Sequence, residues 1–235
     1  MILIEKTEVM GFEQAIRGMR NPKNSWDKSD SGVCKGGYSG IGCVNCAANP
    51  CDHGYNHSFQ IGKNDYELMM KLVKGGPVHA KFRRMITVYV DITAPLYWWK
   101  EFDTYKVGTV ANSCSSLYDL NVKEFKMSDF STDYLLPGSF KCLGFTVKTL
   151  NVARDLYLET KNKKYWWQII QLLPSSYNQK RTVMLNYEVL AGIYPMRRNH
   201  KLDEWKEFCK WIEGLPCSEI IMFDKSEEGR NEQNI

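Results

Sequence analysis

The hydrophobic and polar positions of the chain follow two different periods. Loose alternation over residues 2–10 is typical of a strand, and a β-branched and aromatic run predicts a second strand over 85–92. The remaining apolar positions recur at the three- and four-residue spacing of amphipathic helices. The helices predicted on this basis, with their capping and stop residues, are 11–17, 64–74, 94–102, 128–134, about 146–173, 182–194 and 203–213.

The segment 21–62 shows neither period and reads as a long loop. It contains seven glycines, two prolines and four cysteines. A structureless loop of this length is unusual in a compact domain, so we expect something to order it. Zinc is one explanation, because a Cys-x2-Cys turn supplies two thiolates at a suitable distance. The predicted metal ligands are Cys43, Cys46, Cys51 and His53, with Cys34 and His57 close by. Free thiols and an iron–sulfur site are the alternatives.

Composition narrows the classes of protein that fit this pattern. The 235 residues are 43% hydrophobic and 25% charged, which is typical of a globular protein. The net charge of +4 fits a phosphorylated small molecule better than a nucleic-acid polymer, which would require a clustered basic face. No signal peptide and no run of 18 apolar residues is visible, so we expect no membrane segment and a cytoplasmic location.

One stretch, residues 94–118, carries the clearest functional signal. It begins as an aromatic helix and ends in a run of small polar residues, Asn112 to Ser116. Hydroxyls and backbone N–H groups in such a run can meet a phosphate or a base edge. The sequence therefore predicts a nucleotide site here. Ser113 could equally be an ordinary turn serine, and Cys114 has no obvious base nearby in the sequence.

The order of these features resembles the flavin-dependent thymidylate synthases, the ThyX family. Ala94-Pro95 matches the start of the family's signature helix, and without gaps the signature serine falls on Ser113. His79 falls on the first histidine of an upstream motif. Counting on from Leu173-Pro174, the family's asparagine falls on Asn186 and its late arginine on Arg197. The resemblance covers about residues 64–213.

The resemblance implies a fold and a reaction. The fold would be α+β, a small antiparallel sheet with a helical bundle, forming one domain over 1–235 with the Cys-rich segment 21–62 as an insertion. The reaction would be methylation of dUMP to dTMP, with FAD as the flavin and methylenetetrahydrofolate as the carbon donor. The partner would be a pyrimidine nucleotide, and the family's homotetramer implies a homo-oligomer.

The resemblance also assigns roles to residues. Ser113 and Arg197 would be catalytic. The residues that would bind the substrate are Ser113, Ser115, Lys180, Arg181 and Arg197. Those that would bind the cofactor are His79, Arg83, Lys106 and Asn186. Ordinary structural roles exist for several of them: His79 as a helix cap or core residue, and Arg197 as a solvated helix end.

The chain departs from the family at the signature. Asp103-Thr104-Tyr105 replaces the family's Arg-His-Arg, and a carboxylate cannot pair with a phosphate as arginine does. Two alternatives follow. The protein could bind or modify another pyrimidine nucleotide, with or without flavin, or it could be a non-catalytic, zinc-stabilised interaction protein. The Trp98-Trp99 and Trp166-Trp167 pairs favour packing over ring stacking on a ligand.

Overall fold

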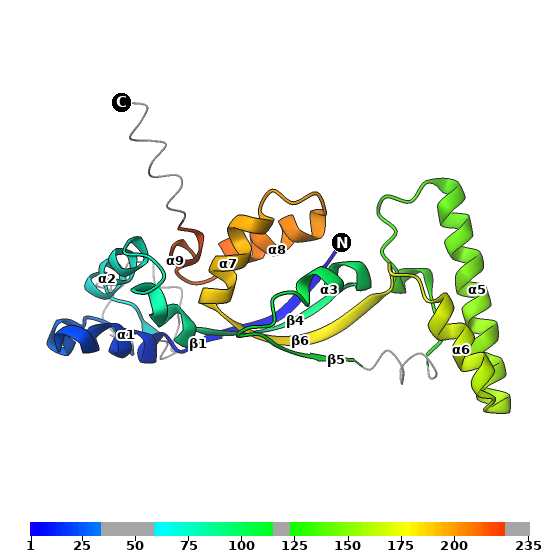
Figure 1. The fold of residues 1–235 in the computed structure, drawn as a ribbon, viewed down its shortest axis with the longest axis horizontal. Coiled ribbons are helices and arrows are strands. Elements are labelled where there is room, and N and C mark those ends of the chain that lie inside the picture. Colours follow the sequence, from blue (N-terminus) through cyan, green and yellow to red (C-terminus); the bar gives the residue numbers. More distant parts are fainter. Residues whose placement is uncertain (34–58, 115–122, 224–235) are drawn as a thin grey trace, which may run out of the picture. The chain divides into compact units, whose positions relative to one another are not determined.

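The chain has an α+β architecture built around one four-stranded sheet. The computed structural model describes residues 1–33, 59–114 and 123–223. The strand order of the sheet is β1-β4-β6-β5 (Figure 1). Its strands are β1 (Leu3–Met10), β4 (Thr87–Pro95), β5 (Val110–Ser113) and β6 (Asn178–Asn186). The predicted α+β class with a small antiparallel sheet is confirmed. Most of the expected Cys-rich insertion, residues 34–58, lies outside the described residues.

The chain divides into two compact units. The first consists of Met1–Thr7, Tyr89–Met184 and His200–Phe208, and the second of Glu8–Val88, Leu185–Asn199 and Cys209–Ile235. In neither unit does any described helix combine the length and apolar character that crossing a membrane requires.

An aromatic core fills the first unit beside β4. Strand β4 ends at Pro95, and helix α3 (Leu96–Phe102) follows directly. Proline has no backbone N–H, so it cannot donate a further hydrogen bond within the sheet. Trp98 and Trp99 of α3 are buried, and the Trp98 ring lies 4.8 Å from that of Trp205 in helix α8 (Asp203–Glu213). The prediction that the tryptophan pair is packing is confirmed for Trp98 and Trp99.

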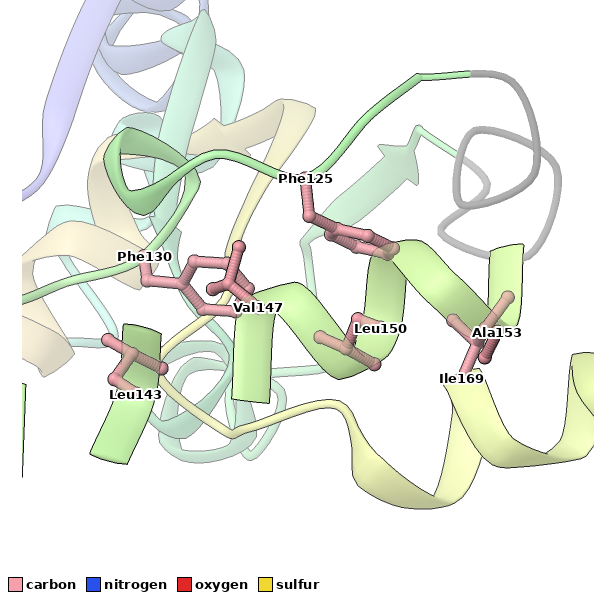
Figure 2. Packing of buried hydrophobic residues seen from close by; sticks show 7 residues of the cluster. All are labelled: Phe125, Phe130, Leu143, Val147, Leu150, Ala153 and Ile169. Atoms are coloured by element: carbon pink, nitrogen blue, oxygen red, sulfur yellow. The ribbon is translucent and has the colours of Figure 1, made fainter. Parts of the chain in front are cut away.

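A helical hairpin makes a second core in the same unit. Helix α5 (Pro137–Thr160) packs beside α6 (Lys163–Leu172), which Asn162 caps. Apolar residues of α5 recur every three or four positions and meet Ile169 of α6, with two phenylalanines from the preceding loop (Figure 2). The members of this cluster are Phe125, Phe130, Leu143, Val147, Leu150, Ala153 and Ile169.

The second unit is mainly helical. Its elements are α1 (Phe12–Arg20), α2 (Lys63–Lys74), the 3-10 helix η3 (Ala80–Met85), α7 (Tyr187–Arg197), α9 (Glu219–Met222) and a small sheet of β2 (Gly32–Val33) and β3 (Phe59–Gln60). Ala15 and Ile16 of α1 and Met69 and Val73 of α2 are buried. Asp65 of α2 is fully buried and forms an ion pair with Arg20 of α1.

The structure corrects several sequence predictions. The helix predicted over 182–194 is wrong in its first part, because β6 continues to Asn186 and α7 begins only at Tyr187. The expected loop at Ser113 is the end of strand β5. Helix α5 begins at Pro137, several residues before the predicted start. The helix predicted over 203–213 is confirmed with the same bounds.

Candidate functional site

The pairing of β5 with β6 brings two predicted site residues together in the first unit. The strands are antiparallel, with Ala111 opposite Val183 and Ser113 opposite Arg181. Residues directly opposite in an antiparallel pair point to the same face of the sheet, with Cβ atoms about 5 Å apart. Ser113 and Arg181 are therefore neighbours across the ladder, although they are far apart in the sequence.

Three contacts hold the guanidinium of Arg181. Its central carbon lies 4.2 Å from the ring centroid of Trp99, which gives a cation–π contact. Its Nε donates to Oε1 of Gln179 at 3.0 Å, and its Nη1 donates to Oδ1 of Asp103 at 2.6 Å. The side chain is only 15% exposed. Its Nη2 has no hydrogen-bond partner in the part of the chain that the structure describes.

The residues beneath Arg181 are themselves fixed. Gln179 is buried, and its Nε2 donates to the backbone oxygen of Cys114 at 3.2 Å. Its own backbone oxygen accepts a hydrogen bond from Nε1 of Trp99 at 2.9 Å. Because the acceptor and the stacking ring are both anchored, the plane of the guanidinium is set before any ligand arrives.

Lys180 lies on the other face of the sheet. Successive side chains of a strand point to opposite faces, so Lys180 and Arg181 diverge. Lys180 forms ion pairs with Asp91 at 3.1 Å and with Glu5 at 3.3 Å. Asp91 also accepts a hydrogen bond from the hydroxyl of Thr182 at 2.7 Å. Lys180 and Arg181, which were predicted to act together on the substrate, do not converge within the chain.

These pairs shift the titration of both groups. The hydrogen bond from Thr182, with that from Lys180, holds the pKa of Asp91 below its usual value. The hydrogen bond to Asp91, with that to Glu5, raises the pKa of Lys180. Each group therefore keeps its charge over a wider pH range.

Among the described residues, four predicted site residues belong to the second unit, and the side chains of Arg83 and Asn186 form hydrogen bonds within the chain. Arg83 is buried, its Nε donates to Glu188 at 2.8 Å, and its Nη1 donates to the backbone oxygen of Ile220 at 3.1 Å. Burial lowers the pKa of Arg83, and the Glu188 carboxylate opposes that shift. Asn186 caps α7, since its side-chain oxygen accepts from the backbone N–H of Val189 at 3.0 Å.

The other two are more accessible. His79 is exposed and directly precedes η3, where its backbone N–H donates to Gly76 at 3.0 Å. Arg197 is the last residue of α7 and is partly exposed. In the first unit, Lys106 is exposed in the connection between α3 and β5.

The remaining predicted site residues are Ser115 and the metal ligands Cys43, Cys46, Cys51 and His53, all of which lie outside the described residues. Within residues 1–33, 59–114 and 123–223, no group of three or more His, Cys, Asp or Glu side chains is arranged to hold a metal ion.

The described cysteines differ in accessibility. Cys114 is exposed, and the described residues place no histidine or carboxylate in hydrogen-bond contact with its thiol. Burial raises the pKa of Cys209 and of Cys217 to about 11, so both remain thiols at neutral pH.

Three contributors to this site escaped the sequence reasoning. Asp103 was recognised as a departure from the family but not as the partner of Arg181, and Gln179 was not recognised at all. Trp99 was assigned to packing alone, whereas it also stacks on Arg181. The signal that could have found them is the period of two along β6, which places Gln179 and Arg181 on the face with the buried Val183.

An α+β chain with this sheet and these helices has the fold of ThyX, the flavin-dependent thymidylate synthase. ThyX from Helicobacter pylori, solved with FAD and dUMP, superposes on the chain with a TM-score of 0.59. The two share 16% sequence identity over 95% of this chain and 96% of that one. PolB from Streptomyces cacaoi, a UMP/dUMP methylase bound with 5-Br dUMP, has a TM-score of 0.55 at 12% identity, covering 94% of each chain. No family model and no curated sequence matches the chain.

Proposed function

We propose that the protein binds a pyrimidine nucleoside monophosphate on the face of β5 and β6 that carries Ser113 and Arg181, and that it methylates dUMP to dTMP. One observation carries the proposal: a prearranged arginine, whose Nη2 has no hydrogen-bond partner among the described residues, lies opposite Ser113 within a ThyX fold. Solved proteins of this fold hold dUMP or 5-Br dUMP.

Each residue would have a distinct part in holding the nucleotide. The Nη2 of Arg181 would donate to a phosphate oxygen, a hydrogen bond strengthened by charge on both partners. The hydroxyl of Ser113 would donate to the phosphate or to the pyrimidine. Ser115 and Arg197 would add contacts on the grounds of the resemblance alone. Lys180 is left out, because Asp91 and Glu5 already neutralise it on the opposite face.

The flavin fits less well than the nucleotide. Reduced FAD would supply the hydride that reduces the carbon taken from methylenetetrahydrofolate. Of the side chains expected to hold it, Arg83 is buried against Glu188 and Asn186 caps α7. Only His79 and Lys106 are exposed. These residues do not fit the flavin as predicted, so we derive no catalytic step through it.

A second function is favoured by one specific observation. Asp103, which stands where the family has an arginine, pairs with Arg181 at 2.6 Å. A carboxylate there disfavours a second anionic ligand such as the flavin pyrophosphate. The alternative is therefore a protein that binds or modifies a pyrimidine nucleotide without flavin.

Spectroscopy and titration together test these functions. An absorbance band at about 450 nm in the purified protein, or after addition of FAD, would favour the flavin-dependent reaction. Binding of dUMP by a protein that takes up no flavin would favour the alternative. Failure to bind either dUMP or FAD would contradict both of these functions. The remaining alternative would then be the non-catalytic interaction protein.

The substitution Arg181→Gln tests the residue that carries the proposal. Loss of a charged hydrogen bond to phosphate should raise the Kd for dUMP by about 10- to 100-fold, measured by calorimetry. Arg84→Gln is the matched control, since Arg84 is exposed on η3 and the change removes the same charge. An equal Kd for the two variants would contradict the assignment of Arg181.

We also propose that the chain forms a homo-oligomer through its helical hairpin. Apolar side chains of α5 and α6 remain exposed beside the packed core of the hairpin, and patches of this kind often mark interfaces. They are Phe140, Phe145, Val152, Trp167 and Leu172. The homotetramer of the ThyX resemblance is the expected form.

A further inference from the structure

Asp103 is the acidic partner of the arginine that the proposed function assigns to the nucleotide. Its carboxylate accepts a hydrogen bond from Nη1 of Arg181 at 2.6 Å, at the position where an oxygen of a bound phosphate would be received. A guanidinium presents its donors as a fork in one plane. While Asp103 is in place, it occupies one N–H of Nη1 and competes with a phosphate for that end of the fork.

The two partners differ in how firmly they are held. Arg181 is 15% exposed and fixed by Trp99 and Gln179, whereas the Asp103 side chain is 46% exposed. Asp103 is the C-cap residue that follows α3, and its backbone N–H donates to the oxygen of Trp99 at 2.8 Å. Its carboxylate has no second partner in the described part of the chain. The carboxylate can therefore move away while the backbone and Arg181 stay in place.

A bound phosphate should displace the carboxylate of Asp103 from Arg181 rather than be excluded by it. An ion pair with one partner half exposed contributes little, because solvent screens it. A phosphate brings up to two negative charges and three acceptor oxygens, so it competes well for the same fork. The displaced carboxylate nevertheless stays on the same turn and repels the incoming anion.

From this geometry we infer that Asp103 is an intramolecular counterion that competes with the phosphate of the ligand for Arg181. The inference rests on the proposed function and concerns the selectivity of that site. Asp103 weakens the binding of nucleotides relative to nucleosides, which carry no phosphate. The difference in affinity between a nucleotide and its nucleoside is therefore smaller at this site than at a site whose arginine has no acidic partner.

The test compares wild type with Asp103→Asn by calorimetric titration with dUMP and with deoxyuridine. Asparagine keeps the size of the side chain and removes the charge. The Kd for dUMP should fall by about fivefold, as expected for loss of a screened ion pair, and the Kd for deoxyuridine should not change. Asp155→Asn is the matched control, because that aspartate also forms an exposed pair with an arginine, Arg154, on α5.

The outcomes separate the inference from the proposed function. Binding of dUMP by wild type with an unchanged or raised Kd in Asp103→Asn would overturn the inference and leave the proposed function standing. An equal gain in Asp155→Asn, or an equal gain for deoxyuridine, would also overturn it. Absence of dUMP binding in both proteins would contradict the proposed function and, with it, the inference.

Discussion

Asp65 shows how much one buried carboxylate can organise. It lies in α2 with no exposed surface and accepts a hydrogen bond from Nε of Arg20 at 2.6 Å. Its other oxygen accepts from the hydroxyl of Ser29, the backbone N–H of Asp30, and both the hydroxyl and the backbone N–H of Ser31. This single side chain thus fixes the chain that leads from α1 to β2.

Replacing Asp65 by asparagine should therefore destabilise the protein strongly. The substitution would leave Arg20 as a buried charge without a counterion, which costs about 3 to 5 kcal/mol in comparable cases. Urea unfolding would measure the change. Glu67→Gln in the same helix is the control, because Glu67 forms only an exposed pair with Lys63 and should cost less than about 0.5 kcal/mol. Similar losses in the two variants would contradict this account.

The same carboxylate should make stability depend on pH. Burial alone would raise the pKa of Asp65, but hydrogen bonds from Ser31, Ser29 and Arg20 outweigh burial and hold the pKa below its usual value. The stabilisation is therefore complete above the unfolded-state pKa of about 3.9 and is lost as the pH falls through the lower folded-state pKa. Wild type should lose stability below about pH 4, and this part of the slope should be absent in Asp65→Asn.

At the same scale, the sequence located only part of the candidate site. The spacing of the ThyX resemblance pointed to Ser113 and Arg181, which the structure places opposite each other. It also assigned Lys180 to the substrate beside Arg181, because both lie where the family places a phosphate-binding arginine. Both residues lie in strand β6, where successive side chains point to opposite faces, so only Arg181 shares the face of Ser113.

Among the elements, the boundary between β6 and α7 shows why the interpretation of 182–194 as one helix failed. Apolar residues of 182–194 satisfy helical spacing, so the period alone does not mark where the strand ends. The local signal was Asn186, a preferred N-cap residue, with Glu188 in the first helical turn. Pairing with β4 and β5 stabilises the strand, and such long-range contacts are invisible in a local pattern.

The start of helix α1 depends on a single glycine, Gly11. Gly11 has φ +96, in the left-handed region, and a Cβ there would lie 2.1 Å from the backbone oxygen of Met85. Gly11→Ala should cost about 2 to 4 kcal/mol, from left-handed backbone strain and overpacking against a rigid carbonyl. Thermal and urea unfolding would measure the loss.

Gly192→Ala provides a control of opposite sign. Gly192 is inside α7 in the same unit, and an added Cβ would meet no atom within 4 Å. Alanine is the better helix former there, by about 0.5 to 1 kcal/mol. If Gly11→Ala proved as stable as wild type, the backbone at the start of α1 would have to differ from that described.

For the whole molecule, the sequence predicted the fold through the order of its motifs rather than through its elements. The resemblance was drawn from the order of His79, Ser113 and Arg197, and the fold is confirmed although the chain shares only 16% identity with the Helicobacter pylori protein. The division into two units was not anticipated. Strands β1, β4 and β6 each have residues in both units, so no boundary of the units falls in a linker that a local pattern could mark.

The proposed homo-oligomer gives a prediction at this scale. Phe145 and Val152 are seven residues apart on α5, so they share one face, away from the Leu143–Val147–Leu150 stripe that fills the core. Phe145 is 74% exposed, so a lysine there should fold normally while placing a charge within a buried interface. Phe145→Lys should lower the mass measured by light scattering and leave the far-UV circular dichroism unchanged.

The control for this variant is Val78→Lys, since Val78 is 80% exposed just before η3 and receives the same substitution. Its mass should equal that of wild type. The interface is then assigned by the difference between two exposed apolar positions, because both variants gain one charge and lose one apolar side chain. A monomeric wild type, or an oligomer that survives Phe145→Lys unchanged, would show that the exposed face of α5 is not where copies of this chain meet.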